Sequence, residues 1–546
     1  MATQSETAFG SVSRVKGTVF KYLAFAASLA GILALAVLLA YVAWDALGLE
    51  TAGTSWYLSY TVTLLVPLLG FSAYARRRPE VTAGAFELVA MTLGGVMLTV
   101  ATVILLLVIA GPAVWLTAFV FVVGPVLGLY VYGQYNREAT WVGIAMLMFL
   151  VVGPFAAWFL FPFVALAAAL VGGPGVYFLS LVVPAAGMAF YLASQRLDLS
   201  RRASLGIAAG LPVLAIAGVP VVDTIPQIAR SVWLTILVMF GIPVGFTAVN
   251  TAKQRERWAA FALPAILVGG FLVGEALVGA LGATQPQAWL DWQYLTSPPS
   301  TFDAEAAGLY PAIIGSVFLI ALVSVFTFVF GVGTALYLEE YAPSSGPLGT
   351  LTRLVNVNIS NLAGVPSVVY GLLGLGIFVN VQANLGPLSY GGFGVGTVLT
   401  GALTLSLLIL PIVVISAQEA IRSVPDSLRQ ASYGMGATRW QTIRNVVLPR
   451  SLPGILTGTI LALGRAIGET APLLVIGAAT TKFSPPGGLF GKLTAMPMQI
   501  YAWAFLPQDD FRYGVLAAGV VTLLIVLLSM NSVAILVRNK YQQEAY

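Results

Sequence analysis

Apolar runs long enough to cross a bilayer recur from one end of the sequence to the other. Of its 546 residues, 59% are hydrophobic and only 9% are charged, whereas soluble domains carry about 25% charged residues. A helix of about 20 apolar residues crosses the hydrocarbon core. Runs of this length favour helices over a membrane β-barrel, whose strands give short alternating segments. We therefore expect an all-α, polytopic membrane protein with about 14 transmembrane helices.

Each predicted helix is an apolar run bounded by polar residues. The runs are 20–45, 56–75, 86–110, 114–133, 140–170, 174–194, 205–221, 231–250, 258–281, 311–337, 354–380, 395–416, 451–478 and 513–537. The first run is too long for a signal peptide, whose apolar region has about 7–15 residues, so we expect it to be retained. The polar, acidic stretch 282–310 predicts an external loop.

The first half of the sequence contains a repeat. Three Pro-X-X-Gly segments begin at Pro67, Pro125 and Pro184, and Ile242-Pro243-Val244-Gly245 is a looser fourth copy. Their glycines, at positions 70, 128, 187 and 245, are 58, 59 and 58 residues apart, which fits two membrane helices and two short loops. The alternative is chance similarity, because Gly and Pro are common in membrane spans. We expect residues 1–256 to form an N-terminal transmembrane extension of about eight helices built on this repeat.

Charged residues predict the orientation of the chain. The net charge of +5 comes from short basic clusters between apolar runs, which is typical of cytoplasmic loops and not of nucleic-acid binding. These clusters are Arg14/Lys16/Lys21, 76–78, Arg137, Arg196/Arg201/Arg202 and Lys253/Arg255/Arg257, and they alternate with turns that carry Asp45, Glu50 and Asp223. Both termini are therefore predicted to be cytoplasmic. The sequence has no Cys and no His, so we expect no catalytic residue and no metal site.

The predicted cytoplasmic loop 417–450 is long and polar, whereas the other internal loops are short. Thr438 and Gln441 have the spacing of a capping box, which opens a helix, and Gly434 and Gly436 break the chain before it. Leu448-Pro449 is expected to close the segment before the next span. The pattern predicts two short helices joined by a glycine turn, a shape suited to docking on a partner. The alternative is an ordered loop without a partner.

A second unusual segment, 464–474, places Arg465 and Glu469 in the middle of the predicted span 451–478. An ionised residue at mid-membrane costs about 2.5–3.5 kcal/mol on insertion scales, which makes it a functional-site hypothesis. Spacing by four residues puts both side chains on one helix face. Arginine can bind an oxyanion through two parallel hydrogen bonds. The alternative is a structural Arg–Glu pair that links two helices.

The loop 417–450 resembles the coupling loop of ABC importer permeases. That family carries Glu-Ala-Ala, three residues, Gly, nine residues, and Ile-X-Leu-Pro. This chain has Gln430-Ala431-Ser432, three residues, Gly436, nine residues, and Val446-Val447-Leu448-Pro449. The resemblance implies ATPase coupling by Gln430, Ala431, Ser432, Gly436, Leu448 and Pro449. It also implies that Gly436 lies between two coupling helices, while Gln430 lacks the family's carboxylate.

Segment 464–474 is similar to the signature of phosphate ABC transporter permeases, and 470–474 looks like the A-type (PstA) subunit rather than its C-type partner. The stretches 336–341, 361–371 and 496–501 agree, as does Asn531. The resemblance covers 257–546 and implies a type I ABC importer permease core there, with 258–281 as its first span. It implies a substrate path for phosphate at Arg465, Glu469 and Thr470.

The resemblance also implies partners: a homologous permease subunit, ATPase subunits and an external phosphate-binding protein, assembled in the plasma membrane. The sequence itself lacks the phosphate-binding loop of an ATPase. The nearest candidate, Gly491-Lys492, is followed by Leu493, and Pro486 occupies the position of the first glycine. ATP and Mg are therefore expected on a partner chain, with no cofactor on this one.

Three other functions stay open from the sequence. The first is a permease for another oxyanion, such as phosphonate, molybdate or sulfate, and the second is an ATP-independent secondary transporter. A membrane enzyme is the third, but the chain has no His, no Cys and no carboxylate cluster to support it.

Overall fold

The structure is a computed structural model that describes residues 14–136, 141–197, 199–225, 228–343, 345–380, 383–385, 388–390 and 392–544. Apart from an antiparallel hairpin of β1 (Ala383–Leu385) and β2 (Leu388–Tyr390), the regular structure of these residues is helical. Thirteen helices are long and apolar enough to cross a membrane, or up to 14 if one bent pair counts as a span. The predicted all-α polytopic fold is therefore confirmed.

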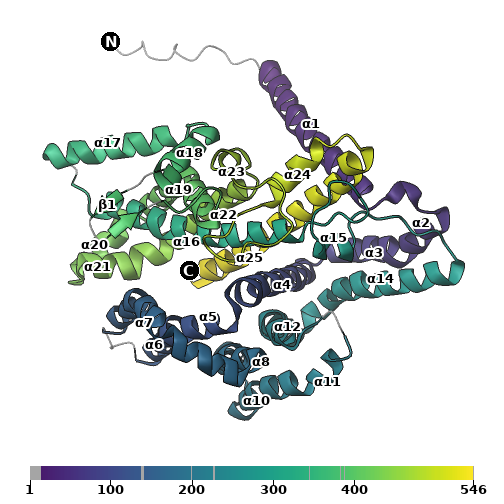
Figure 1. The fold of residues 1–546 in the computed structure, drawn as a ribbon, viewed down its shortest axis with the longest axis horizontal. Helices are drawn as coiled ribbons and strands as arrows, with labels where there is room; N and C mark the ends of the chain where they lie inside the picture. The colour runs from purple at the N-terminus through teal and green to yellow at the C-terminus, as the bar shows by residue number, and fades with distance from the viewer. Residues whose placement is uncertain are drawn as a thin grey trace, which may run out of the picture.

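The N-terminal half contains α1 (Arg14–Ala46) and then eight further membrane-length helices (Figure 1), several of them interrupted by π-helical segments. They are α2 (Thr54–Tyr60) with η2 (Thr61–Leu65) and α3 (Val66–Ala75); α4 (Pro79–Thr102) with η3 (Val103–Ala110); α5 (Gly111–Ala118) with η4 (Phe119–Val123) and α6 (Gly124–Tyr135); α7 (Trp141–Val171); α8 (Gly173–Tyr177) with η5 (Phe178–Val182), α9 (Val183–Tyr191) and η6 (Leu192–Arg196); α10 (Arg201–Ala217) with α11 (Val219–Val222); α12 (Arg230–Ile236) with η7 (Leu237–Gly241) and α13 (Ile242–Lys253); and η8 (Arg255–Phe261) with α14 (Ala262–Leu281).

The C-terminal half begins with the short helix α15 (Trp292–Thr296). It continues with α16 (Tyr310–Glu340), α17 (Gly346–Leu362), α18 (Ser367–Gly374) with η9 (Leu375–Asn380), α19 (Val398–Arg422), α20 (Asp426–Gly434), α21 (Arg439–Thr442) with η10 (Ile443–Val447) and α22 (Leu448–Ile467), α23 (Ala471–Val475), α24 (Met496–Ala504), and η11 (Asp510–Val515) with α25 (Leu516–Glu544). Its core lies between α16, α18, α19 and α22, where Val323, Leu405 and Ile409 are fully buried.

The four prolines of the sequence repeat share one local geometry. Pro67, Pro125, Pro184 and Pro243 each lie at the second residue of a helix that directly follows a five-residue π-helical segment. Proline has no N–H to donate to the carbonyl four residues earlier, and a π-helical segment redirects the hydrogen bonds of the preceding turn. The four copies therefore share a backbone feature as well as a sequence pattern.

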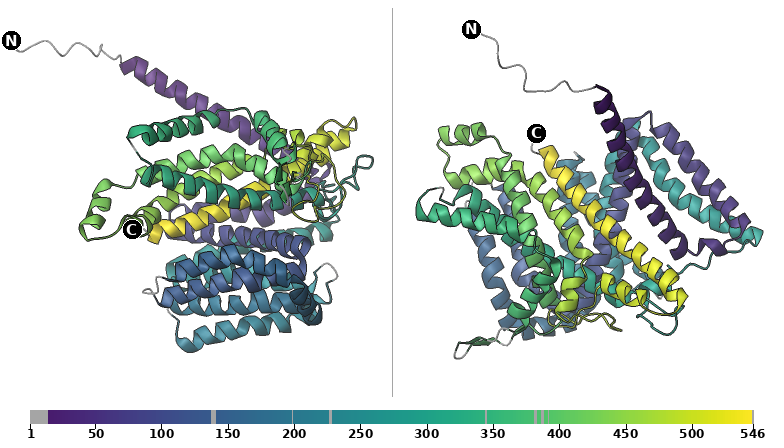
Figure 2. Two further views of the ribbon diagram at one scale, coloured as in Figure 1. Left: turned by 60° about the vertical axis from the view of Figure 1, so that its left-hand side comes forward. Right: turned by 90° about the horizontal axis from the view of Figure 1, so that it is seen from above.

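The helices before residue 257 pack on the back of the C-terminal half. In Figure 2, α4 lies between α25 and the helices α5 to α13, and α4 and α1 both contact α25. The predicted first span of the core, 258–281, forms η8 and α14, and α14 packs on α2, η2 and α3. Gly270 lies against Thr63, and Tyr60 donates a hydrogen bond to Glu275 over 3.1 Å. The proposed division at residues 256/257 stays a prediction.

Two of the predicted spans are not single continuous helices over the predicted residues. The span 354–380 is a bent pair, in which α17 and the α18–η9 helix meet at 112°. Gly364 and Pro366 lie at the bend, and the residue before a proline disfavours helical geometry. The span 451–478 stops at Ile467, and its helix begins at Arg439 instead. The expected helix break at Leu448-Pro449 is absent, because η10 continues directly into α22.

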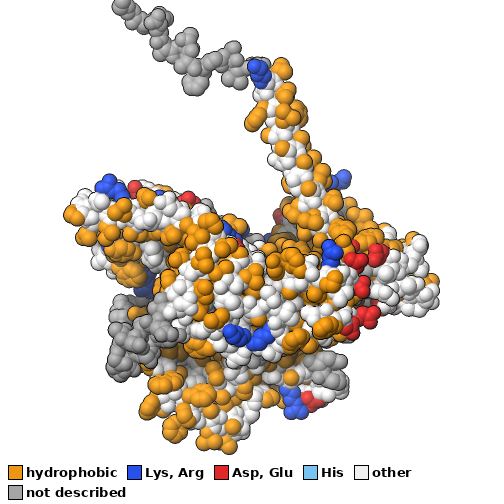
Figure 3. Space-filling view, turned by 45° about the horizontal axis from the view of Figure 1, so that its top comes forward, with side chains coloured by type: hydrophobic (Ala, Val, Ile, Leu, Met, Phe, Trp, Pro, Cys, Tyr) orange, Lys and Arg blue, Asp and Glu red, His pale blue; other side chains and the backbone are white. Residues whose placement is uncertain are grey.

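The described surface is mostly apolar, as a lipid-facing surface requires. Figure 3 shows hydrophobic side chains over the visible face and around α1, which projects from the rest of the molecule. None of the residues in the most apolar window of α1 is buried. In the turn before α12, a hydrogen bond from Arg230 lowers the pKa of the Asp223 carboxyl. Arg137 of the predicted basic clusters lies outside the described residues.

Candidate functional site

Arg465 lies level with the middle of a neighbouring membrane-length helix, α19. Its helix, α22, runs antiparallel to α19. A Cβ on Gly458 would lie 2.2 Å from the Ser416 Cβ, and one on Gly454 would lie 2.8 Å from the Ala420 Cβ. Continuing this register brings Arg465 level with Ile409, close to the centre of α19. The mid-membrane depth of Arg465 stays a prediction.

The chain leaves helical geometry directly after Arg465. α22 ends at Ile467, and Gly468, Glu469 and Thr470 connect it to the short helix α23. Gly468 has a low helix propensity, and Pro472 has no N–H to continue the ladder. Arg465 and Glu469 are therefore not on one helix face, as the four-residue spacing predicted. They meet across the end of the helix instead.

The contact between the two charged residues uses only part of the guanidinium. Nε of Arg465 donates to Oε1 of Glu469 over 3.2 Å, and among the described residues neither terminal nitrogen of Arg465 has a protein partner. The Arg465 side chain is 45% exposed and that of Glu469 is 17% exposed. Thr470 is half-buried, and its side chain does not cap α23. A planar fork of free donors therefore lies beside a carboxylate acceptor.

Helix α18 packs against this break and fixes its position. A Cβ on Gly371 would lie 2.9 Å from the Pro472 Cα and 2.8 Å from the Val475 Cβ, so the close approach requires glycine. The Tyr370 hydroxyl donates to the Leu362 carbonyl over 2.7 Å and thereby holds α18 at the bend after α17. In the glycine-rich stretch 371–376, Gly371 and Gly374 have neighbours too close for a Cβ, whereas Gly376 has no neighbour within 4 Å.

The coupling segment, residues 426–447, has the predicted form of two short helices and a glycine turn. Gly436, between α20 and α21, has φ +82°, and the Ala437 N–H bonds the Ser432 carbonyl. Both hydrogen bonds of the predicted capping box at Thr438 and Gln441 are present. These features give the turn a defined shape.

The sequence-predicted coupling residues lie in different environments. Gln430, Ala431 and Pro449 are exposed, and Leu448 is half-buried. Ser432 is buried, and its hydroxyl shares a 2.8 Å hydrogen bond with the Thr442 hydroxyl, which joins α20 to α21. Sequence reasoning missed the exposed apolar side chains at the tip, namely Tyr433, Met435 and Trp440. In the sequence, these three apolar residues stand out because they lie among the polar residues of a predicted loop.

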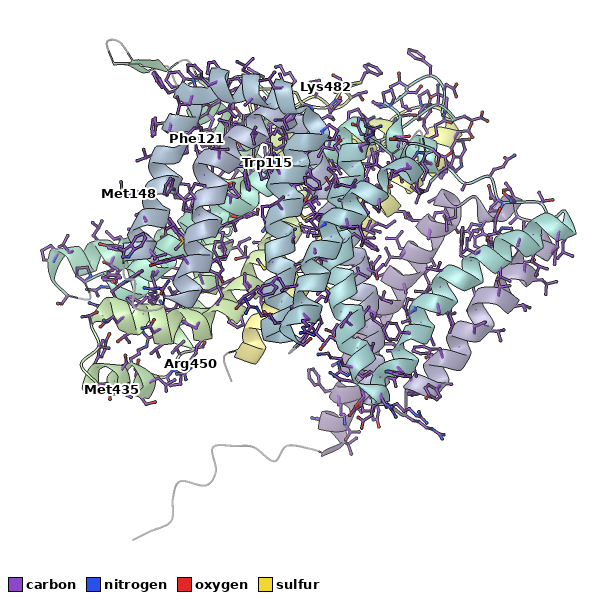
Figure 4. The ribbon with its side chains drawn as sticks, turned by 90° about the horizontal axis from the view of Figure 1, so that it is seen from below. Trp115, Phe121, Met148, Met435, Arg450 and Lys482 are labelled. Atoms are coloured by element: carbon purple, nitrogen blue, oxygen red, sulfur yellow. The ribbon has the colours of Figure 1, made fainter. Side chains whose placement is uncertain are left out.

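The second half of the coupling segment and Arg465 belong to one helical unit. Figure 4 shows Met435 and Arg450 at the end of the molecule opposite Lys482. From Arg439 the chain is helical through α21, η10 and α22 to Ile467, a length of 29 residues. At 1.5 Å per residue this unit is about 43 Å long. A displacement at α21 can therefore reach the segment around Arg465 along one continuous backbone.

The family match covers the part of the chain that contains Arg465 and the coupling segment. Residues 331–540 match the family described as binding-protein-dependent transport system inner membrane component. The phosphate transport system permease protein PstA 1 of Mycobacterium tuberculosis is 34% identical over 43% of this chain and 71% of its own length. PstA of Yersinia pestis is 33% identical over 45% of this chain and 77% of its own.

A solved structure of the MetNI methionine ABC transporter also matches, with 18% identity over 43% of this chain and 97% of that chain. The TM-score of this match is 0.33. Both PstA relatives are more than 30% identical to this chain, and each match covers more than two thirds of the relative's own length. The chain is thus a PstA-type member of the binding-protein-dependent inner membrane components, the permease subunits of ABC transporters.

Proposed function

We propose that this permease carries phosphate inward through a path that includes Arg465, Glu469 and Thr470. The observation that carries the proposal is the pair of terminal nitrogens of Arg465, which have no partner among the described residues and lie level with the middle of α19. An anion that enters a low-dielectric path needs a compensating positive charge. A guanidinium fork matches two oxygens of a phosphate group. The names of the relatives, phosphate transport system permease proteins, support the same substrate.

Glu469 gives the site a preference among oxyanions. Monohydrogen phosphate carries a hydroxyl that can donate to a carboxylate, while sulfate has no proton at neutral pH. An ionised Glu offers only acceptors. Phosphate therefore gains a hydrogen bond where sulfate meets charge repulsion. Phosphonate shares the proton and stays a second candidate substrate.

The partners of this subunit are part of the proposal. The exposed flank of Arg465 leaves room for a homologous permease to complete the path, and the neighbouring helices α17 and α18 expose the apolar residues Leu348, Leu351 and Leu372. An ATPase subunit that binds ATP and Mg docks on the coupling segment at Tyr433, Met435 and Trp440. An external phosphate-binding protein delivers the anion. The docking distinguishes this subunit from an ATP-independent transporter.

The orientation follows from the ATPase. Because ATPase subunits of this class work in the cytoplasm, the coupling segment is placed there. Figure 2 shows that α1 begins, and α25 ends, on the side of the molecule where α20 and α21 lie. Both termini of the chain are therefore proposed to be cytoplasmic, in a multi-pass plasma membrane protein.

Radiolabelled phosphate uptake tests the substrate. Cells that produce this chain with its permease, ATPase and binding-protein partners should take up phosphate only when ATP is available. A hundredfold excess of sulfate or molybdate should leave the rate within about twofold of its original value, because neither anion can donate to Glu469 at neutral pH. Strong competition by sulfate would overturn the phosphate assignment, and uptake without the ATPase would favour a secondary transporter.

The packing of α18 on the site gives a further expectation. Gly371→Ala should reduce phosphate uptake at least about tenfold, because the new Cβ would separate α18 from Pro472 and Val475 and displace residues 468–470. Gly376→Ala, in the same glycine stretch but with open space around it, is the matched control and should retain the parent rate. Equal rates in the two variants at matched membrane levels would contradict the role of this contact.

A further inference from the structure

Three consecutive residues at the end of α16 each hold one arginine from a different part of the cytoplasmic region. Glu339 accepts two hydrogen bonds from Arg422 at the end of α19, with Nε at 2.8 Å and Nη2 at 2.5 Å. Glu340 accepts from Nη1 of Arg429 in α20. The Tyr341 ring lies under the guanidinium of Arg439, the first residue of α21, with 5.2 Å between Cζ and the ring centroid.

The middle contact of the three is buried. The side chains of Glu340 and Arg429 are 5% and 17% exposed, whereas Arg422 is 61% exposed. Arg429 also donates Nη2 to the Ile421 carbonyl over 2.8 Å. One side chain of α20 is thus tied to the end of α16 and to the last turn of α19. A buried pair of this kind is sensitive to the loss of one partner, since the other charge is left uncompensated.

These side chains connect α20 to the membrane helices. The backbone of α20 packs mainly against α21 and η10, and Ser432 and Thr442 join the two short helices through their hydroxyls. Without the Arg429–Glu340 pair, the docking helix could swing on its own loop. With the pair, a force applied to α20 reaches α16 directly.

We propose that Glu339-Glu340-Tyr341, the α16 clamp, is a positioning site that fixes the coupling segment to α16 so that ATPase movement is passed into the membrane. Arg429 and Glu340 carry most of this link, and the Arg422–Glu339 pair, whose arginine is 61% exposed, carries less. The proposal rests on the proposed function, because it needs an ATPase docked on the coupling segment. Neither Glu340 nor Arg429 contacts the substrate path.

The test compares variants in the purified, reconstituted transport complex. Glu340→Gln should keep the ATPase subunit bound and should keep ATP hydrolysis within about threefold of the parent. The phosphate transported per ATP hydrolysed should fall at least about tenfold, because hydrolysis no longer moves α16. Glu339→Gln is the matched control on the same turn, and its transport ratio should stay within about twofold of the parent.

A double variant separates positioning from stability. Glu340→Gln combined with Arg429→Gln leaves no unpaired buried charge, so the thermal stability of the complex should return towards that of the parent. The transport ratio should stay low, because the link is still missing. Recovery of transport in the double variant, a normal ratio in Glu340→Gln, or loss of the ATPase subunit from Glu340→Gln would each overturn the clamp. A parent complex without ATP-dependent phosphate uptake would instead defeat the proposed function.

Discussion

Arg465→Ala is expected to abolish phosphate uptake, to below about 1% of the parent rate. The substitution removes the positive charge in the last turn of α22, which a desolvated phosphate needs as compensation. The loss of the Arg465–Glu469 hydrogen bond is a minor effect on folding, because the Arg465 side chain is nearly half exposed. Radiolabelled uptake at matched membrane levels measures the change.

Conservative variants of the same pair sharpen this expectation. Arg465→Lys should retain only a few per cent of the uptake, because an ammonium group cannot reproduce the planar fork. Glu469→Gln should keep some transport but should lose discrimination against sulfate, because the repelling charge is gone. Arg512→Ala removes an exposed arginine of η11 outside the path and should leave uptake unchanged. Parent-like uptake by Arg465→Ala would reduce the pair to a structural contact.

Gly436→Leu is expected to uncouple transport from ATP hydrolysis, with uptake reduced at least about tenfold while the protein still inserts into the membrane. A Cβ at Gly436 meets no neighbour within 4 Å, so a close contact of the Cβ is not the cause. The backbone is the cause, because φ +82° is unfavourable for residues with a Cβ by about 1–2 kcal/mol. The turn relaxes to another conformation, and Tyr433 and Met435 leave the docking surface.

Gly436→Asn is the matched control at that position. Asn tolerates positive φ better than other side chains do, so this variant should keep at least about half of the parent uptake. Copurification of the ATPase subunit and phosphate uptake are the two measurements. If Leu and Asn at this position behave alike, the left-handed turn is not what holds the two coupling helices.

The number of spans could be predicted from the sequence because every helix that crosses the hydrocarbon core needs about 20 apolar residues. The observed membrane-length helices follow the apolar runs. The bend between α17 and α18 could not be predicted the same way, since both halves are apolar and hydropathy does not report direction. Hydropathy also does not show that α22 ends at Ile467, because residues 471–478 beyond it are apolar as well. Gly468 and Pro472, which both disfavour a helix interior, were the signals of this end in the sequence.

The candidate site was predicted in part. Arg465 and Glu469 were identifiable because ionised residues are rare in apolar runs, and Gly436 because its neighbours form a turn pattern. The contact of Gly371 with Pro472 joins positions about 100 residues apart. The contact of Arg429 with Glu340 joins positions 89 residues apart. A single sequence contains no signal for such pairings, because they depend on how the helices pack.

The contact between α1 and α25 has a consequence for synthesis of the protein. Ala46, at the end of α1, is fully buried in a cluster with Val515 and Ala518, and Leu516, the first residue of α25, lies 470 residues further along the chain. At about 5–20 residues per second, a ribosome needs roughly 25–95 seconds to make them. For that interval α1 lies in the bilayer without its contact to α25. A chain truncated before α25 would leave the apolar surface of α1 that packs on α25 exposed to lipid.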